Sequence, residues 1–462
     1  MTDTNKQSYQ IRTLSEAKLD ILLINSPLFR DKTDFDPEDS LPPLGLGYIA
    51  SNLKTNALKV AVTDAVANNI PIEELIATIN SNPPSFLGLN IFTPNFHLVQ
   101  EIIERSHPQK GFIVGGGATK STFEKILQFN TPHSINVVIG DGDSIVSAIV
   151  KDEVHEDPAF RQRNRSVHVV NNSSIYFPAD ISNLPLDRTF FTNEPMNNHH
   201  GLLEATIITS RGCIYNCAFC GAARSLNKDT PVRLRDTRSV RDEVTDLLTI
   251  YPGLESIRVL DDLFLRNPQT IEVATSIFSA RIGWRSMAHI LSFRGCSKQL
   301  LKDLKASGCN EVFIGIESGS ARTLKAIHKM HELTELKETV FALLDTGIHV
   351  KSYFILGFPS ETEHDFQETY ELAKSLKSYS QKSPGEFRVS VFKFRPYHGT
   401  ELSEKLHIRS EDEVPFTLDH HISEMIGRHQ FNIVSKNYSA CDSETLDKFI
   451  RDTMSLNTSD VK

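Results

Sequence analysis

Three cysteines in the middle of the chain are the residues best placed to do chemistry. Cys213, Cys217 and Cys220 lie within eight residues, directly after an apolar run. Iron-sulfur clusters are held by thiolates at short spacings, usually four of them, so a compact set of three leaves one iron without a protein ligand. The same spacing is also compatible with a structural zinc loop, which would need a fourth ligand. The remaining cysteines are scattered singly, and we interpret them as small buried hydrophobes: Cys296, Cys309 and Cys441.

This loop resembles that of the radical S-adenosylmethionine (SAM) superfamily. The CxxxCxxC spacing matches, and Phe219 supplies the aromatic residue before the last cysteine. The resemblance implies a 4Fe-4S cluster on the three thiolates, with the amino and carboxylate groups of SAM on the open iron. It also implies reductive cleavage of SAM to a 5'-deoxyadenosyl radical that takes a hydrogen atom from a small-molecule substrate. The electron would come from an external one-electron reductant such as flavodoxin or ferredoxin.

Around this loop the sequence predicts an incomplete (β/α)6 barrel of the TIM type over residues 201–400. Short apolar runs alternate with helical patterns through about six units, and each run is followed by polar or glycine-rich residues. The loops after the strands of such a barrel converge on one mouth, where functional residues gather. A small helical carboxyl-terminal region, residues 401–462, follows. The expected strands are Ala205–Thr209, Ser256–Leu260, Met287–Phe293, Val312–Ile316, Val350–Leu356 and Val389–Phe394.

Carboxylates at two of these strand ends are implied SAM contacts. Asp261 and Asp262 match the position that receives the methionine ammonium, although a helix-capping pair is the structural alternative. Glu317 and Ser318 match a motif on the fourth strand that reaches the ribose or methionine part of SAM. A buried carboxylate there requires a ligand or an Arg partner. Gly357 begins the turn on which the adenine would pack, but a plain turn would look the same.

The sixth strand end supplies the substrate candidates. Tyr397 and His398 lie in a run with proline, aromatic and Gly-Thr-Glu residues that is common in one subclass of the superfamily. A buried Tyr and an exposed His are equally compatible with this pattern, and no catalytic residue is assigned. Beyond Glu401, Asp419, His420 and His421 lie in a polar region without a substrate signal.

Residues 19–153 predict a separate doubly wound (Rossmann-like) domain. Five apolar runs alternate with helix-length segments, as in a parallel sheet buried on both faces. Residues 1–18 are expected to form a flexible arm and residues 154–200 a connector, with a short strand over Ser174–Phe177. His199 and His200 are expected to be solvated. The runs are Ile21–Asn25, Val60–Thr63, Phe86–Phe92, Phe112–Val114 and Val137–Ile139.

Small and polar residues follow these runs, where the ligand crevice of a doubly wound sheet forms. They are Ser26, Thr93, Gly115, Gly116, Gly117, Gly140 and Gly142. Taken alone they are compatible with tight turns or with a phosphate cradle, and GxGxxG spacing is absent. With Pro42 to Gly45 opening a helix, their order resembles the cobalamin-binding domain that precedes the radical SAM domain in one subclass, which implies that they bind cobalamin. The DxHxxG motif is missing, since Ala65 follows Asp64, so no His is expected below the cobalt.

The resemblance therefore implies a cobalamin-dependent methyltransferase that methylates an unactivated carbon or phosphorus of a metabolite. Two alternatives remain: a radical SAM mutase, dehydratase or cyclase without net methyl transfer, and a non-catalytic Fe-S protein. The net charge of −9 argues against nucleic-acid binding. The start of the chain lacks a signal pattern and no apolar run is long enough to span a bilayer, so a cytoplasmic protein without a membrane partner is expected.

Overall fold

The computed structural model describes residues 18–27, 41–157, 159, 161–162, 167–170, 174–228, 230–278, 282–329, 331–406 and 436–458. The chain divides into two compact units. Unit 1 holds the residues up to Glu194 together with Lys228–Pro231. Unit 2 holds Pro195–Asn227 and the chain from Val232 onward. Asp419, His420 and His421 lie outside the described residues.

Unit 1 is built on a seven-stranded sheet in the order β2-β1-β3-β4-β5-β7-β6. Strands β1 to β5 are parallel, as the buried apolar runs predict, and β7 extends the parallel run beside β5. Only β6 is antiparallel, to β7. The strands are β1 (Ile21–Asn25), β2 (Val60–Asp64), β3 (Phe86–Asn90), β4 (Gly111–Gly115), β5 (Ser134–Val138), β6 (Arg161–Gln162) and β7 (Val167–Val170).

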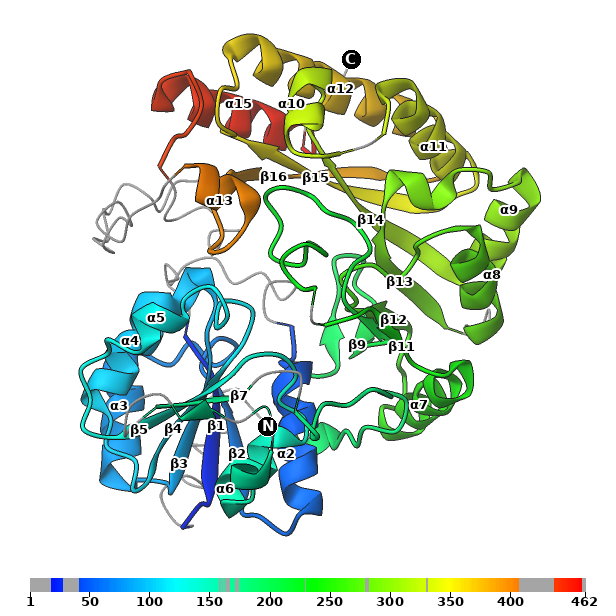
Figure 1. Ribbon diagram of the computed structural model, residues 1–462. Coiled ribbons are helices and arrows are strands. Elements are labelled where there is room, and N and C mark those ends of the chain that lie inside the picture. Colours follow the sequence, from blue (N-terminus) through cyan, green and yellow to red (C-terminus); the bar gives the residue numbers. More distant parts are fainter. Residues whose placement is uncertain are drawn as a thin grey trace. The chain divides into compact units, whose positions relative to one another are not determined.

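Helices cover both faces of this sheet, which makes it doubly wound (Figure 1). One apolar core joins the sheet to α3, α4 and α5, and a second joins the opposite face to α2 and α6. The order reverses between β1 and β3, so the carboxyl ends of these strands form a topological switch point. The helices are α2 (Leu44–Thr55), α3 (Ile72–Ser81), α4 (Phe96–Arg105), α5 (Phe123–Ile126) and α6 (Ile145–Lys151), with short 3-10 turns η2 (Thr93–Asn95), η3 (Val154–Glu156) and η4 (Arg188–Phe190).

The segment expected as a connector contributes to this sheet. Strands β6 and β7 lie within residues 154–200, whereas the short strand expected over Ser174–Phe177 is a turn. The prediction of that strand was wrong. Its hydrogen bonds are those of a turn: Phe177 N–H donates to the Ser174 carbonyl and Tyr176 N–H donates to the Ser174 hydroxyl.

Unit 2 is a curled, open half barrel, and the expected (β/α)6 architecture is confirmed. Its sheet has the order β16-β15-β14-β13-β12-β9-β8, in which β9 and β12 to β16 are parallel and β8 is antiparallel to β9. The strands are β8 (Met196–Asn197), β9 (Leu203–Ile207), β12 (Ser256–Val259), β13 (Gly283–Ala288), β14 (Cys309–Glu317), β15 (His349–Leu356) and β16 (Phe387–Lys393).

Side chains alternate along the barrel strands between the helices and the barrel axis. Outward residues such as Ile257, Trp284 and Val350 join the large apolar core beneath the helices. Inward positions carry charged and aromatic side chains, including Arg258 on β12 and Phe313 on β14, whose guanidinium and ring lie 4.9 Å apart. The axis of this barrel is therefore lined by charged and aromatic side chains, unlike the branched apolar filling of a closed TIM barrel.

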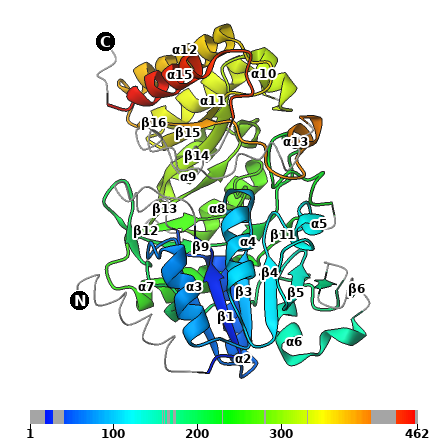
Figure 2. The same cartoon turned by 90° about the vertical axis from the view of Figure 1, so that its left-hand side faces the viewer.

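Most helices of unit 2 pack on the outer face of its sheet, and α12 and α15 lie together beside the last strands (Figure 2). Asn457, just after α15, donates to and accepts from the Val389 backbone of β16. The helices are α7 (Thr237–Ile250), α8 (Pro268–Ile277), α9 (Lys298–Ala306), α10 (Ala321–Ala326), α11 (Leu333–Asp345), α12 (Glu363–Ser380), α13 (Glu401–Lys405) and α15 (Ser443–Ser455), with η5 (Ile290–Phe293) after β13. Within the described ranges, no helix is long and apolar enough to cross a membrane.

Candidate active site

The three clustered cysteines lie on a loop at the carboxyl end of β9. Short strands β10 (Ser210–Arg211) and β11 (Arg233–Leu234) pair antiparallel and close the base of this loop. Inside it, the Tyr215 N–H donates to the Cys213 sulfur at 3.5 Å. All three thiols are partly exposed. Burial nevertheless raises their pKa, for Cys220 to about 12.

Backbone hydrogen bonds fix the centre of the cysteine loop to two other segments. Ala218 N–H donates to the Ile327 carbonyl at 3.1 Å, and Leu402 N–H donates to the Ala218 carbonyl at 3.0 Å. Phe219 packs edge to face on Phe358, with ring centroids 5.4 Å apart. These residues share a small apolar cluster, so the loop is anchored next to the carboxyl ends of β14, β15 and β16.

Asp261 and Asp262 follow β12 but have different surroundings. Asp261 is buried and accepts hydrogen bonds from Thr209 N–H at 2.7 Å and from the hydroxyls of Thr209 and Ser210. It ties β12 to the chain that enters the cysteine loop. Asp262 is exposed and lines a cavity. The protein atoms around its carboxyl group still displace water from it, and this desolvation raises its pKa. The helix-capping alternative was wrong, because Asn267 caps α8.

Glu317 ends β14 in a strained backbone conformation. Its φ of 68° lies in the left-handed region, and the register between β14 and β15 shifts at this point. Such strain is uncommon outside glycine and tends to occur at functional sites. The buried carboxylate pairs with Lys329 at 3.1 Å, and Lys329 also donates to the Gly315 carbonyl at 3.0 Å. The partner is thus a lysine rather than the expected arginine.

Lys329 brings a positive charge beneath the cysteine loop. Burial alone would lower its pKa, but Glu317 and then Cys217 hold the pKa above its usual value. The same charge counteracts the effect of burial at Cys217, where it favours the thiolate. No sequence pattern marks this lysine, because it lies in the loop after α10 rather than at a strand end.

The remaining predicted SAM residues divide between packing and turn positions. Ser318 is buried, and its hydroxyl contacts Thr369 on α12 at 3.1 Å. Gly357 has a φ of 94°, so a left-handed turn follows β15. Glu361 accepts from Gly357 N–H at 2.8 Å and from Phe358 N–H at 2.9 Å, and it thereby holds the turn that supports Phe219. Burial raises the pKa of Glu361 to about 8.

A cavity of about 570 Å³ opens inside the barrel beside the cysteine loop. This volume is within the range of small-molecule sites. Tyr397 lines the cavity and His398 does not; both side chains are half-buried. The lining residues are Phe219, Arg258, Val259, Leu260, Asp261, Asp262, Met287, Phe313, Tyr353, Ile355, Phe392, Lys393, Phe394, Arg395 and Tyr397.

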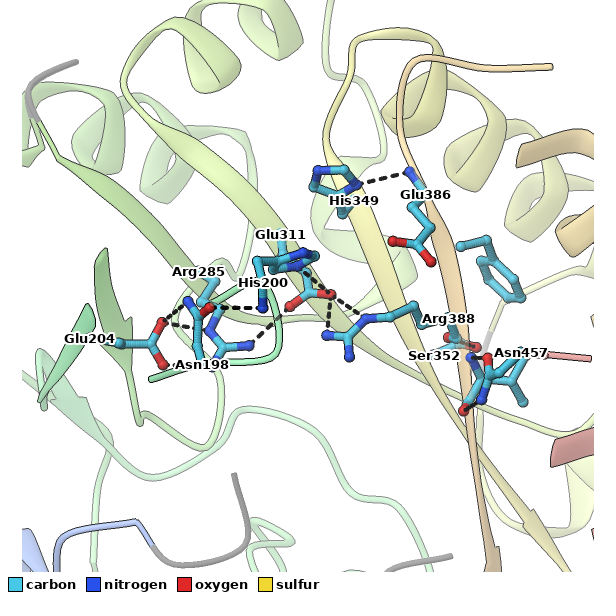
Figure 3. A network of polar contacts seen from close by, with 12 residues as sticks. Asn198, His200, Glu204, Arg285, Glu311, His349, Ser352, Glu386, Arg388 and Asn457 are labelled. Atoms are coloured by element: carbon cyan, nitrogen blue, oxygen red, sulfur yellow. Dashed lines mark hydrogen bonds and ion pairs between the residues drawn. The ribbon is translucent and has the colours of Figure 1, made fainter. Parts of the chain in front are cut away.

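A network of buried ion pairs lies at the opposite, amino-terminal end of the barrel strands (Figure 3). Arg285 donates two hydrogen bonds of 2.6 Å to Glu204 and contacts Glu311 at 3.2 Å. Arg388 donates to Glu311 at 2.6 Å. His200 joins them 3.7 Å from Glu311, so only the exposed His199 matches the expectation of solvated histidines. This barrel floor, Glu204, Arg285, Glu311, Arg388 and His200, closes the end of the barrel away from the cysteines.

The predicted ligand edge of unit 1 is partly rigid and partly open. Asn25 donates to Asp64 at 2.8 Å and accepts from Asn90 at 2.7 Å, which binds the ends of β1, β2 and β3 together. Ser26 follows, and its hydroxyl is buried without a hydrogen-bond partner among the described residues. Thr93 is half-buried at the start of η2, next to Phe92, which is 43% exposed.

The glycines at this edge have different roles. A Cβ on Gly116 would lie 2.5 Å from the Ile91 carbonyl, so Gly116 is required by the fold itself. A Cβ on Gly115 would meet only Val138, at 3.9 Å, and one on Gly117 would meet only the exposed Phe92 ring. Gly140 has a φ of 108°, and a Cβ on Gly142 would meet the Ile49 side chain at 2.8 Å. Gly115 and Gly117 therefore leave open space at the sheet edge.

Comparison with known families identifies both parts of the chain. The sequence model of the radical SAM superfamily matches residues 207–373, which span the cysteine loop and the barrel strands. This part of the chain is a radical SAM domain. The B12 binding domain model matches residues 36–150. The chain therefore combines a radical SAM domain with a B12 binding domain.

Relatives and solved structures resemble this protein along most of its length. An uncharacterized methyltransferase of Pyrococcus horikoshii is 26% identical over 375 residues, which cover 79% of this chain and 78% of that protein. An anaerobic magnesium-protoporphyrin IX monomethyl ester cyclase of Cereibacter sphaeroides is 21% identical over 394 residues, 78% of this chain and 63% of that protein. The radical SAM methyltransferase TsrM from Kitasatospora setae shares the fold with a TM-score of 0.60 at 14% identity, covering 84% of this chain and 76% of TsrM.

The cysteine loop of this radical SAM protein has the donor set that a 4Fe-4S cluster requires. Three thiols lie on one loop, and the buried cation of Lys329 opposes the effect of burial on the pKa of Cys217. In the described part of the chain, no three His, Cys, Asp or Glu side chains converge as they would on a single metal ion. A cubane cluster takes its thiolates on different irons, so its ligands need not meet at one point. The loop fits the cluster.

The edge of unit 1 also fits the corrin that its family model implies. The Ser26 hydroxyl is buried and lacks a partner among the described residues, and a buried polar group of this kind needs one. The exposed Phe92 ring and the open space at Gly115 and Gly117 add an apolar, accessible surface at the same edge. Asp64 accepts from Val66 N–H and Ala67 N–H, so the position of the missing DxHxxG motif forms a turn.

Proposed function

We propose that this protein is a cobalamin-dependent radical SAM methyltransferase that acts on a small-molecule metabolite. The observation that carries the proposal is the three-cysteine loop opening onto a cavity inside the barrel, in a chain that also has a B12 binding domain. The name of the Pyrococcus relative, a methyltransferase matched along most of both chains, supports methyl transfer. Residues 19–153 are assigned to cobalamin binding and residues 201–400 to the radical SAM barrel.

When bound, the cluster supplies the electron that cleaves SAM, and cobalamin supplies a methyl group for transfer. Cys213, Cys217 and Cys220 hold the cluster in this proposal, and Lys329 stabilises their negative charge. Asp262 faces the cavity and accepts from the methionine ammonium of SAM. Asp261 positions the loop, because its oxygens already accept from Thr209 and Ser210.

The other predicted SAM residues surround the same space. Glu317, held by Lys329 at 3.1 Å, is assigned to the ribose or methionine part of SAM. The Gly357 turn and Phe219 provide an apolar surface for the adenine. Ser318 positions this strand end through Thr369. Tyr397 lines the cavity and is the better substrate contact of the pair at the sixth strand end.

In unit 1, residues at the carboxyl ends of the strands are assigned to the corrin. Ser26 offers a buried hydroxyl that has no hydrogen-bond partner in the described part of the chain, and Thr93 lies beside the exposed Phe92. The turn Gly115–Gly117 and the pair Gly140 and Gly142 let the backbone approach closely. An external one-electron donor such as flavodoxin or ferredoxin completes the system, which requires a reducing, cytoplasmic compartment.

A second candidate, a cyclase that forms no methylated product, follows from one observation. The Cereibacter relative carries the name of a cyclase and matches 78% of this chain. Both candidates use the same cysteine loop, so only the fate of the SAM methyl group distinguishes them.

Methyl-labelled SAM and cobalamin-loaded, anaerobically reconstituted protein provide the test. We expect 5'-deoxyadenosine in the presence of a strong reductant, and label in the product once candidate metabolites are supplied. Replacing Cys213, Cys217 or Cys220 by Ala abolishes the cluster absorbance and 5'-deoxyadenosine. Cys296→Ala, at a partly buried cysteine away from the loop, is the control and keeps both. Turnover that leaves the label in SAM and in the methionine released from it, with none in the product, would favour the cyclase, and absence of 5'-deoxyadenosine would remove both candidates.

A further inference from the structure

Arg266 is a buried cation on the short segment between β12 and α8. It is 6% exposed, and hydrogen bonds hold the backbone on both sides of it. Leu265 N–H donates to the Met287 carbonyl on β13 at 3.2 Å. Arg266 N–H donates to the hydroxyl of Thr270, in the first turn of α8, at 2.8 Å. The guanidinium is therefore carried by a backbone that the barrel fixes in place.

The side chain of Arg266 reaches the strand that enters the cysteine loop. Its Nη2 donates to the Ser210 hydroxyl on β10, and that hydroxyl donates in turn to the carboxylate of Asp261. Asp261 also accepts from Thr209 N–H at 2.7 Å. Ser210 lies three residues before Cys213. Because a guanidinium stays protonated in proteins, this chain of hydrogen bonds places a permanent positive charge at the start of the loop.

Cys213 lies within the field of this charge. Burial raises the pKa of Cys213, whereas the charges of Lys329 and Arg266 act in the opposite direction. Burial lowers the pKa of Arg266 in turn, and the charges of Asp261 and then Cys213 counteract this effect. Two buried cations from different segments of the barrel thus act on the loop: Lys329 after α10 and Arg266 before α8.

A fixed charge beside the cysteine loop matters because the negative charge of a bound cluster changes on reduction. Reduction adds one electron to the cluster, taken from the external one-electron donor, which is oxidised, and no bond forms or breaks. Net charge, hydrogen bonding and solvent exposure around a cluster set its reduction potential. In a buried site, where charges are poorly screened, a nearby cation favours the more negative, reduced state.

We infer that Arg266 raises the reduction potential of the cluster held by Cys213, Cys217 and Cys220. The arginine acts through its field and through Ser210, so it is a positioning residue rather than a catalytic one. Its effect is to make electron transfer from a given donor more favourable. This inference rests on the proposed function only in taking the three cysteines as cluster ligands, and it is independent of cobalamin and of methyl transfer.

Redox titration of the full-length protein, reconstituted with iron and sulfide and kept free of SAM, tests the inference. Titanium(III) citrate supplies the electrons, and cluster absorbance and electron paramagnetic resonance follow the reduced state. At the midpoint potential of the parent protein, Arg266→Gln and Arg266→Met should lower the ratio of reduced to oxidised cluster roughly ten-fold, or about 59 mV for a one-electron couple. Arg266→Met is included because a hydrophobic side chain is well tolerated in place of a buried charge.

Three more variants separate the charge from the shape of the loop. Arg266→Lys keeps the charge and should restore most of the ratio. Ser210→Ala removes the hydrogen bond but keeps the charge, so it should change the ratio much less than Arg266→Gln does. Arg238→Gln, whose side chain is 86% exposed on α7, is the surface control and should leave the ratio unchanged, because solvent and salt screen an exposed charge.

The possible results answer separate questions. An unchanged ratio in both neutral variants overturns the inference, and so does an equal fall in Ser210→Ala, since loop geometry would then cause the effect. Neutral variants that fold but take up no iron also overturn it, because the arginine would then hold the loop rather than set the potential. A comparable fall in Arg266→Lys overturns it even if neither neutral variant folds. A parent protein without a cluster on the three cysteines refutes the proposed function, and this inference with it.

Discussion

Glu361 provides a sharp test of the turn that supports the cysteine loop. Its side chain is 1% exposed and accepts hydrogen bonds from Gly357 and Phe358. Burial raises its pKa from 4.5 to about 8. The folded protein therefore holds this carboxyl group protonated at neutral pH, whereas the unfolded chain does not. We expect Glu361 to make the stability of the barrel depend on pH.

The sign and size of this dependence follow from the two pKa values. Stability from the raised pKa is fully present below pH 4.5 and is lost as the pH rises through about 8, because the folded state binds the extra proton. The total loss is on the order of 5 kcal/mol, of which about 2 kcal/mol falls between pH 6 and pH 8. Glu361→Gln keeps a neutral acceptor for both N–H groups and removes the titration. The variant should therefore exceed the parent protein in stability by a margin that grows with pH.

Urea unfolding followed by tryptophan fluorescence measures this margin. Trp284 is the only tryptophan and is fully buried in the core of unit 2, so its emission reports on the barrel. Glu371→Gln, at an exposed position of α12, is the control and should change little between pH 6 and pH 8. If the stabilities of the parent and Glu361→Gln run parallel over this range, the carboxyl group titrates normally and the reasoning is wrong.

Three further outcomes follow from the site geometry. Asp262→Asn and Glu317→Gln should each weaken SAM binding about ten-fold to a hundred-fold while the cluster absorbance stays unchanged. Equilibrium dialysis with labelled SAM measures the affinity. If neither variant changes it, both carboxylates have a structural role only. Gly115→Ile, whose Cβ would meet only Val138 at 3.9 Å, should lower cobalamin retention while the melting temperature stays within a few degrees; retained cobalamin would contradict the assigned edge. Arg285→Met should lower the unfolding free energy by about 3–5 kcal/mol, because Glu204 is left buried without its cation, and a neutral effect in urea unfolding would argue against the ion pair.

The sequence predicted the barrel best where the apolar run and the strand coincide. Val350–Leu356 was expected and β15 spans His349–Leu356. The third strand was misplaced, because Met287–Phe293 is the apolar run while β13 is Gly283–Ala288 and Ile290–Phe293 forms η5. Arg285 points toward the barrel axis, so the strand that carries it lacks a continuous apolar run.

The hydrogen-bond and ion-pair partners of the site residues were harder to predict than the positions of those residues in the sequence. The strand end at Asp261 and Asp262 was recognisable, but only the structure separates Asp261, bound to Thr209 at 2.7 Å, from Asp262, which faces the cavity. Lys329 and His200 reach their carboxylate partners from loops, and contacts of this kind leave no periodic pattern. The three cysteines were identifiable because all of them lie in one short segment of the sequence.

The barrel floor has a consequence for the order in which this protein assembles. Glu204 meets Arg285 across 81 residues of sequence, and Glu311 meets Arg388 across 77. A buried charge without its partner is strongly unfavourable, so a nascent chain that ends before β16 cannot seal the barrel. Long-range pairings of this kind also slow folding. The cysteine loop emerges from synthesis well before Arg388, so it is exposed while the barrel strands around it are still incomplete. The fold therefore favours loading of iron and sulfur after the last strand has docked.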